Sequence, residues 1–419
     1  MSFSEFYQRS INEPEQFWAE QARRIDWQTP FTQTLDHSNP PFARWFCEGR
    51  TNLCHNAIDR WLEKQPEALA LIAVSSETEE ERTFTFRQLH DEVNAVASML
   101  RSLGVQRGDR VLVYMPMIAE AHITLLACAR IGAIHSVVFG GFASHSVAAR
   151  IDDAKPVLIV SADAGARGGK IIPYKKLLDD AISQAQHQPR HVLLVDRGLA
   201  KMARVSGRDV DFASLRHQHI GARVPVAWLE SNETSCILYT SGTTGKPKGV
   251  QRDVGGYAVA LATSMDTIFG GKAGGVFFCA SKRSMALLLF GYRLGGGAFV
   301  YRLRAAAGGD GDYRLRRIAD LAGLRRVVEN RREISGEPNV LSANRHSRAE
   351  KIPYRRNSQT RSLVAGSALS GGGAAGRANR QLGEQYAGCA GHRQLLADRI
   401  RLADYGDCSR SGRQADASG

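Results

Sequence analysis

The feature that most restricts the fold of this chain is the regular alternation of helix-forming and strand-forming segments between residues 83 and 195. Leu89, Val93 and Val96 begin an apolar stripe with spacings of four and three residues, which predicts a helix that ends at Gly104. The segments that follow are, in order, a strand at 111–115, a helix at 119–131, a strand at 136–139, a helix at 144–154, a strand at 157–161, a helix at 175–186 and a strand at 191–195. This alternation predicts an α/β domain with a parallel sheet, whose ligands bind at the carboxyl ends of the strands.

A later strand runs directly into a loop that suits phosphate. Residues 237–250 read Ile-Leu-Tyr-Thr-Ser-Gly-Thr-Thr-Gly-Lys-Pro-Lys-Gly-Val. Glycines let backbone N–H groups approach anionic oxygens, hydroxyls donate hydrogen bonds, and lysines add positive charge. The residues that would bind phosphate are Thr240, Ser241, Gly242, Thr243, Thr244, Gly245 and Lys246. A Walker A motif has four residues between its first glycine and its Gly-Lys pair, and a serine or threonine after the lysine. Here only two residues lie between Gly242 and the pair Gly245–Lys246, and Pro247 follows the lysine, so the loop is not a Walker A motif.

This loop resembles the signature of the adenylate-forming superfamily. Enzymes of that superfamily use Mg·ATP to convert a carboxylate into an acyl-adenylate and pyrophosphate, and then pass the acyl group to a thiol. The resemblance implies that residues 240–246 close over the β- and γ-phosphates of ATP, with Thr240 and Lys246 as catalytic residues and ATP with Mg²⁺ as the cofactor. It also implies the fold, a large N-terminal domain with parallel sheets flanked by helices, here incomplete.

Three further stretches are similar to those of acetyl- and propionyl-CoA synthetases: Phe-Trp-Ala-Glu-Gln at 17–21, Val-Val-Phe-Gly-Gly-Phe at 137–142, and Ala-Asp-Ala-Gly-Ala-Arg-Gly-Gly-Lys at 162–170. The first implies an N-terminal extension, 1–65, which is rich in aromatic residues and is expected to be irregular and packed on the main domain. The third implies a coenzyme A site, formed by Arg167, Gly168, Gly169 and Lys170, whose two basic residues contact the 3′-phosphate.

The substrates follow from the same resemblance. Residues 1–280 are most similar to propionate-activating enzymes, so the expected reaction is the activation of propionate by ATP and its transfer to coenzyme A. Activation of acetate is the near alternative. Transfer to a carrier-protein phosphopantetheine is a third possibility, which the N-terminal extension and the Arg167/Lys170 loop oppose.

The net charge of +13 divides the chain near Ser281. Residues 1–280 hold 30 basic and 30 acidic residues, whereas residues 281–419 hold 23 Arg, 2 Lys and only 12 acidic residues. The family motifs that should follow the phosphate loop are absent from 282–419. An excess of Arg over Lys with abundant Gly and Ala is typical of a GC-rich gene read out of frame. We therefore expect an AMP-binding domain over 66–281, a tail over 282–419 that is out of frame and disordered, and an inactive chain.

The Arg-rich tail also suggests a function of another class, nucleic-acid binding through phosphate contacts. Beyond its first twenty residues the tail offers four aromatic residues for base stacking, Tyr313, Tyr354, Tyr386 and Tyr405, so nucleic acid is not the expected partner.

Other classes of site are not expected from this sequence. No apolar run reaches the roughly 18 residues of a membrane helix, and the first residues lack a signal-peptide pattern, which predicts a cytoplasmic protein with no membrane partner. The seven cysteines form no CxxC pair and are expected to be reduced thiols, with no metal site. His55, His135, His145, Arg252 and Asp253 are isolated and are not expected to be catalytic. The oligomeric state stays open.

Overall fold

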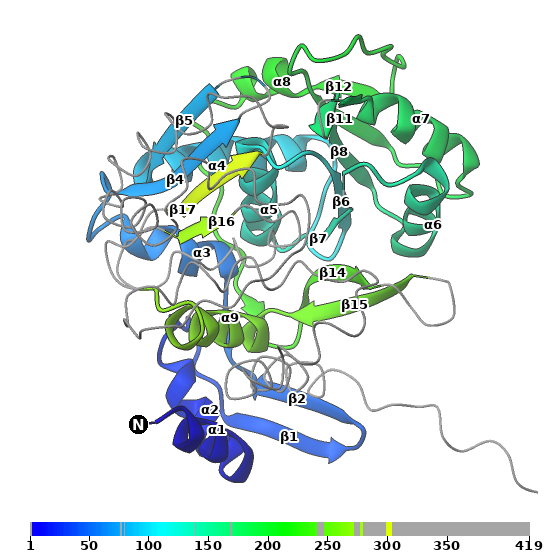
Figure 1. Cartoon of the computed structure of the whole chain (residues 1–419). Coiled ribbons are helices and arrows are strands. Elements are labelled where there is room, and N and C mark those ends of the chain that lie inside the picture. The colour runs from blue at the N-terminus through cyan, green and yellow to red at the C-terminus, as the bar shows by residue number, and fades with distance from the viewer. Residues whose placement is uncertain are drawn as a thin grey trace, which may run out of the picture.

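The computed structural model describes residues 2–271, apart from 76–77, 79, 139, 168–169 and 241–246, together with 277–279 and 299–303. Its centre is a seven-stranded sheet with the order β12-β11-β8-β6-β7-β14-β15 (Figure 1). The strands are β6 (Arg110–Tyr114), β7 (Ile134–Val137), β8 (Leu158–Ala162), β11 (His191–Val195), β12 (Asp209–Asp211), β14 (Thr234–Thr240) and β15 (Lys248–Asp253). All pairings are parallel except that of β14 with β15. The predicted parallel sheet is confirmed.

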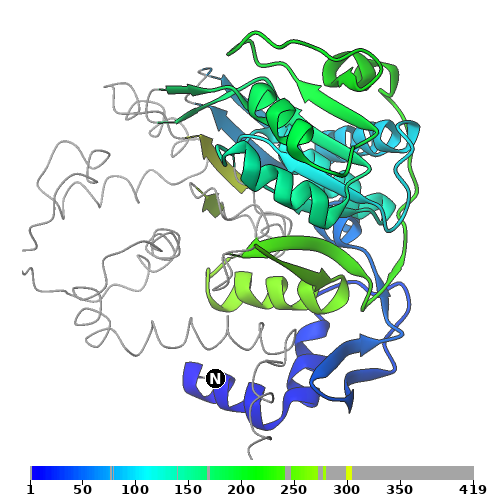
Figure 2. The ribbon, with the colours of Figure 1, turned by 90° about the vertical axis from the view of Figure 1, so that its right-hand side faces the viewer.

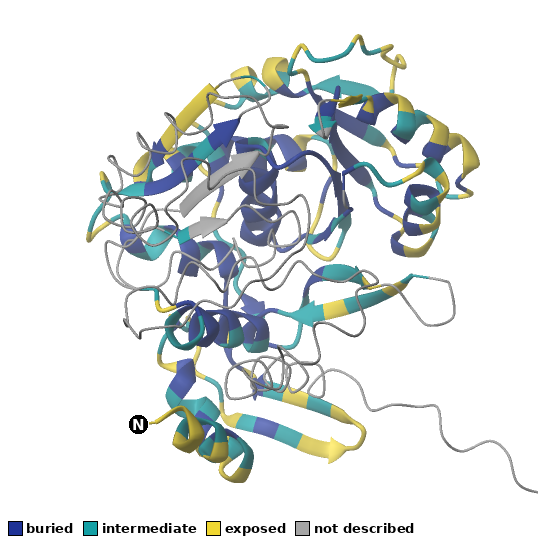
Figure 3. Cartoon of the chain, viewed as in Figure 1, coloured by how far each residue is buried: buried dark blue, intermediate teal, exposed yellow. Residues whose placement is uncertain are grey.

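Helices cover both faces of this sheet, as Figure 2 shows. They are α4 (Phe86–Ser102), α5 (Ala119–Ile131), α6 (Ser144–Ala154) and α7 (Tyr174–Gln184). Side chains alternate along a strand, so Val111 and Val113 of β6 join the core that contains α4 and α5. Leu112 and Tyr114 join the second core, formed with α6 and α7. The dark blue interior of Figure 3 marks these two buried layers.

The helix ends follow from local chemistry. At the start of α4, the Thr85 hydroxyl accepts from the Gln88 N–H, and the Gln88 side chain accepts from the Thr85 N–H. Helix α5 ends at Gly132, whose φ of 75° is left-handed. A Cβ at Gly132 would lie 3.0 Å from Leu229 and 3.1 Å from Arg107, so a larger residue there would be crowded as well as strained in its backbone.

A second sheet packs beside the first and has the order β16-β17-β4-β5. Its strands are β4 (Leu69–Ser75), β5 (Glu80–Thr85), β16 (Phe277–Cys279) and β17 (Phe299–Leu303). Strand β17 runs parallel to β4, with Phe299 opposite Leu71. Residues 299–303 belong to the tail expected to be disordered, so that expectation is wrong for these five residues, because main-chain pairing with β4 and β16 holds them as a strand. Tail residues other than 299–303 lie outside the described residues.

The N-terminal extension is folded, which corrects the prediction that it is irregular. It contains α1 (Phe3–Asn12), α2 (Pro14–Ala22), the hairpin of β1 (Gln33–Asn39) and β2 (Phe42–Cys47), β3 (Arg50–Thr51), α3 (Leu53–Ala57) and the 3-10 turn η1 (Asp59–Trp61). A chain of aromatic contacts joins Phe17, Trp18, Trp45 and Phe46 with ring centroids 5.2 to 6.1 Å apart. The Arg24 guanidinium also lies 2.6 Å from Asp266 of α9 (Gly255–Thr267).

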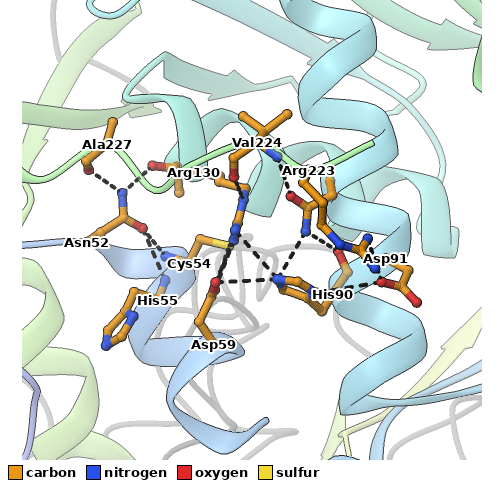
Figure 4. A network of polar contacts seen from close by, with 12 residues as sticks. Asn52, Cys54, His55, Asp59, His90, Asp91, Arg130, Arg223, Val224 and Ala227 are labelled. Atoms are coloured by element: carbon orange, nitrogen blue, oxygen red, sulfur yellow. Dashed lines mark hydrogen bonds and ion pairs between the residues drawn. The ribbon is translucent and has the colours of Figure 1, made fainter. Parts of the chain in front are cut away.

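A buried polar network joins this extension to the central domain (Figure 4). Arg130 at the end of α5 donates from Nη1 to both carboxylate oxygens of Asp59, at 2.8 and 3.0 Å, and from Nε to the Val224 carbonyl at 2.6 Å. Asn52 donates from Nδ2 to the carbonyls of Ala129 and Ala227, each at 2.7 Å. The network therefore fixes η1, α5 and the segment before β13 (Leu229–Glu230) against one another.

Candidate active site at the carboxyl edge of the sheet

Strands β6, β7, β8 and β14 are neighbours in one sheet and run in the same direction, so their carboxyl ends meet at one edge. Those ends are Tyr114, Val137, Ala162 and Thr240. Three of the strands are followed by a stretch singled out from the sequence: 137–142 at the end of β7, 162–170 at the end of β8, and the predicted phosphate loop after β14. The fold thus brings the three stretches to one edge.

The predicted phosphate loop connects β14 to β15. In the register of this hairpin, Thr240 lies opposite Lys248, and both are exposed. Residues 241–246, which include Lys246, lie outside the described residues. The structure thus positions the two ends of the loop, with Thr240 at one and Lys248 at the other.

Helix α6 supports the strand that leads into this loop. Tyr239 donates from its hydroxyl to Oδ2 of Asp153 at 2.5 Å. The Arg150 guanidinium carbon lies 5.2 Å from the centroid of the Tyr239 ring and 4.7 Å from that of Phe142. Burial, together with the Asp153 carboxylate, raises the pKa of Tyr239, which keeps its phenol neutral and able to donate.

Two tyrosines fill the space beneath the turn at 140–142. A Cβ on Gly140 would lie 2.1 Å from the Tyr174 hydroxyl, and one on Gly165 would lie 3.0 Å from it. Tyr114 stacks on Tyr174 with ring centroids 5.1 Å apart and donates to the Phe142 carbonyl at 3.2 Å. Burial raises the pKa of Tyr114 to about 12. Neither tyrosine was expected from the sequence, although the glycines at 140, 141 and 165 were a signal that bulky groups approach the backbone there.

The predicted coenzyme A residues form a small hairpin of β9 (Gly165–Arg167) and β10 (Lys170–Ile172). Arg167 and Lys170 are opposite each other in its register, so the two positions share one face, and Gly168 and Gly169 between them lie outside the described residues. Asp163 holds the base of the hairpin, since its Oδ2 accepts from the N–H groups of Leu199 at 2.7 Å and Ala200 at 3.1 Å.

The polar residues that have no partner nearby in the sequence lie in the following places in the structure. Burial lowers the pKa of His135 to about 4, so its ring is neutral near pH 7. Asp253 accepts from the Tyr257 N–H at 2.8 Å at the start of α9. His145 is exposed on α6, and His55 lies 3.6 Å from Asp26 in the extension. None of these histidines lies in the 140–142 turn, the β9–β10 hairpin or the stem of the phosphate loop.

Within the described ranges, no three His, Cys, Asp or Glu side chains are grouped closely enough to hold a metal ion. Cys47, Cys54, Cys128 and Cys236 are buried free thiols, and burial raises the pKa of Cys54 and Cys128 to about 12. In the same part of the chain, no helix combines the length and apolar character needed to cross a membrane.

Comparison with known proteins matches two family profiles: the AMP-binding enzyme profile over residues 58–302 and the acetyl-coenzyme A synthetase N-terminus profile over residues 3–57. Over 281 residues, 67% of this chain, the sequence is 90% identical to the propionate–CoA ligase of Salmonella typhimurium, of which it covers 45%. Over 275 residues, 65% of this chain, it is 42% identical to human acyl-CoA synthetase short-chain family member 3, mitochondrial, of which it covers 40%.

The solved structure of acetoacetyl-CoA synthetase from Streptomyces lividans superposes with a TM-score of 0.66 and 25% identity, covering 77% of this chain and 49% of that one. The chain therefore spans less than half the length of the relatives it matches. Because the AMP-binding profile matches more than half of its residues, and its sheet has the parallel arrangement that the motifs predicted, the chain belongs to the AMP-binding enzyme family.

Proposed function

We propose that residues 1–281 are the substrate-activating part of an AMP-forming acid–thiol ligase, which converts propionate to propionyl-adenylate and then to propionyl-CoA. The observation that carries this proposal is the 90% identity to the Salmonella propionate–CoA ligase over the N-terminal 67% of the chain. That part contains the whole phosphate loop and the whole β9–β10 hairpin. Acetyl-coenzyme A synthetases match at 40 to 45% identity, which keeps acetate as the alternative substrate.

In the first reaction, the carboxylate attacks the α-phosphorus of ATP and pyrophosphate leaves. Such chemistry depends chiefly on positioning the reactants and on stabilising the charge of the leaving group. We assign that task to Thr240, Ser241, Gly242, Thr243, Thr244, Gly245 and Lys246. The position of Thr240 supports the assignment, because it lies opposite Lys248 at the carboxyl edge, where parallel sheets bind ligands.

Magnesium would enter with the nucleotide. No described group of carboxylates or histidines is arranged to hold a metal ion, and Mg²⁺ is commonly bound through substrate phosphates and water with only one or two protein carboxylates. When bound, Mg²⁺ would neutralise phosphate charge, while the hydroxyls and N–H groups of the loop orient the oxygens.

For the second reaction, we assign the 3′-phosphate of coenzyme A to Arg167 and Lys170, together with Gly168 and Gly169, which lie between them in the sequence. The register of β9 with β10 supports this assignment, since two basic residues on one face of a hairpin repel each other unless an anion lies between them. The Asp163 contacts with residues 199 and 200 would hold this hairpin in place.

We propose the domain limits 1–65, 66–281 and 282–419, and that the tail results from a frameshift near codon 282. The change from 30 basic and 30 acidic residues to 25 and 12 supports a change of reading frame there. The protein would act in the cytoplasm on propionate, ATP and coenzyme A, and the 419-residue chain would be inactive.

The test compares the 419-residue chain with a version whose reading frame is restored after codon 281. We expect propionate-dependent exchange of pyrophosphate into ATP only from the restored chain, at a higher rate than with acetate. A higher rate with acetate would establish the acetate alternative, and exchange with neither acid would overturn the proposed function. Full acyl-CoA synthesis by the 419-residue chain would refute the frameshift.

A further inference from the structure

A cavity of about 430 Å³ lies near the amino ends of β6 and β7, at the edge of the central sheet opposite to the candidate active site. The loop between α4 and β6, the end of α5 and the segment before β13 line it, and the lining includes Arg101, Val105, Gln106, Arg107, Ile131 and Ala227. The chain segments that contain these residues, 80–138 and 170–240, are described throughout. The cavity has the volume of a small-molecule site.

Hydrogen bonds between these segments hold the walls of the cavity in place. The Gly108 N–H donates to the Gly132 carbonyl at 2.9 Å, which joins the loop before β6 to the loop before β7. The Ala227 N–H donates to the Arg130 carbonyl at 2.8 Å, which joins the segment before β13 to the end of α5. The cavity is therefore formed before any ligand enters it.

The lining combines apolar surface with polar side chains that reach solvent. Val105 and Ile131 are 2% and 3% exposed and supply the apolar part. Arg101 and Gln106 are exposed and supply the polar part at the mouth of the cavity. An apolar lining with a few polar groups at one side suits a ligand that has an apolar body and one charged group.

Two arginines at the mouth bring positive charge that no carboxylate balances within the described part of the chain. Arg107 does have such a partner, since its Nε donates to Glu233 at 2.9 Å. Arg101 has none there, and neither has Arg190, which precedes β11. A Cβ at Gly104, which also lines the cavity, would lie 3.7 Å from Nη1 of Arg190. Both guanidinium groups can therefore reach the same ligand.

The surroundings limit how much negative charge this ligand can carry. Helices α4 and α5 both end at the cavity, and the carboxyl end of a helix carries about half a negative charge. The two helix ends thus offset about one of the two positive charges of Arg101 and Arg190. Asp109 and Arg110, which follow the lining loop, offset each other. The balance that remains, about one positive charge, suits a carboxylate better than a phosphate dianion.

We propose that this cavity binds an organic monocarboxylate, with the carboxylate group between Arg101 and Arg190 and the apolar body against Val105 and Ile131. Guanidinium groups suit this role because each can donate two parallel hydrogen bonds to one carboxylate. The site lies at the amino edge of the sheet, whereas the proposed reaction uses the carboxyl edge. The inference therefore goes beyond the proposed function and does not depend on it.

The test measures binding of 4-fluorobenzoate to the 419-residue chain by fluorine NMR, with the uncharged 4-fluorobenzamide as the matched ligand. We expect saturable binding of the acid and binding of the amide that is weaker by about tenfold, because the amide lacks the charge. Arg101→Gln and Arg190→Gln should each weaken binding of the acid about threefold, since contacts at an exposed mouth are partly screened by water. Arg44→Gln, an exposed arginine of β2, is the control and should bind as the parent does.

A further variant leaves both arginines unchanged. Gln106→Glu keeps the size of an exposed side chain and places a negative charge at the mouth, so it should weaken binding of the acid about tenfold, and it decides the matter if an arginine variant does not fold. Parent-like binding by Gln106→Glu, or by both arginine variants, overturns the inference, because the probe would then lie elsewhere. Equal affinity for acid and amide, or no saturable binding to the parent, also overturns it. Equal losses in Arg44→Gln and Arg101→Gln would show attraction to the general surface charge and overturn it as well.

Discussion

Asp59 shows how single side chains secure the junction between the N-terminal extension and the AMP-binding domain. Burial alone would raise its pKa, but the contact with His90 and the charge of Arg130 lower the pKa from 3.8 to about 2. A carboxylate whose pKa is lowered by folding stabilises the folded state at every pH above its unfolded value. This contribution is present above about pH 4 and is lost as the pH falls toward 2.

We therefore expect Asp59→Asn to reduce the free energy of unfolding at pH 7 by about 2 kcal/mol, because the change removes the charge to which Arg130 is paired. Urea unfolding at pH 7 measures this loss. Asp91→Asn is the control, since Asp91 is 47% exposed in its contact with Arg223, and its effect should stay within about 0.5 kcal/mol. Equal effects of the two changes would contradict the prediction.

Gly140 is required for space rather than for conformation. Gly140→Ala would place a Cβ 2.1 Å from the Tyr174 hydroxyl, so the ring or the turn must move, at a cost of about 1 to 3 kcal/mol. A lower thermal unfolding midpoint measures this cost. Removing the hydroxyl with Tyr174→Phe in the same chain should recover part of the loss. An unchanged midpoint for the single variant would show that the site has room.

At the scale of elements, the sequence predicted the central domain well and the extension poorly. The helix predicted at 119–131 and the strand at 191–195 have the bounds of α5 and β11, because long apolar segments between glycines and prolines can form few other elements. The extension is built from short elements held by aromatic contacts such as Trp18 with Trp45, which no periodic pattern reveals.

The β9–β10 hairpin should act on coenzyme A alone. In a chain with its frame restored, Lys170→Ala is expected to raise the KM for coenzyme A and to leave pyrophosphate exchange unchanged, because the contact is remote from the reacting atoms. Loss of one charge-assisted contact costs about 1.5 to 3 kcal/mol, or about 10- to 150-fold in KM. Lys201→Ala, on the exposed segment after β11, is the control. A fall in pyrophosphate exchange with an unchanged KM would contradict the assignment.

At the scale of the whole molecule, two sheets and an N-terminal extension are joined by buried contacts, and the second sheet takes one strand, β17, from beyond residue 281. The AMP-binding profile also continues to residue 302. The composition changes at Ser281, whereas the described strand β17 ends at Leu303. The end of the fold and the change in composition therefore need not fall at the same residue.

Limited proteolysis of the 419-residue chain shows at which residue the stable fold ends. Because β17 pairs with β4 through five residues, we expect trypsin to leave a core whose mass places its carboxyl end beyond Leu303, even though the tail is rich in arginine. A core that ends near residue 280 would show that the β17 pairing does not protect the chain. An intact 419-residue product would make the tail a stable domain.

The place of β14 in the sheet also bears on the order in which the protein folds. Strand β14 pairs with β7, from which it is separated by almost a hundred residues, whereas β6 and β7 are joined by one helix. Pairings between segments that are distant in the sequence form slowly, because closing the long loop between them costs conformational entropy. We therefore expect β14, the strand that leads into the predicted phosphate loop, to be inserted late, after β6, β7 and β8 have formed the surface that receives it. During synthesis, we expect the edge at which β6, β7, β8 and β14 end to be completed only when the ribosome has passed residue 253, where β15 ends.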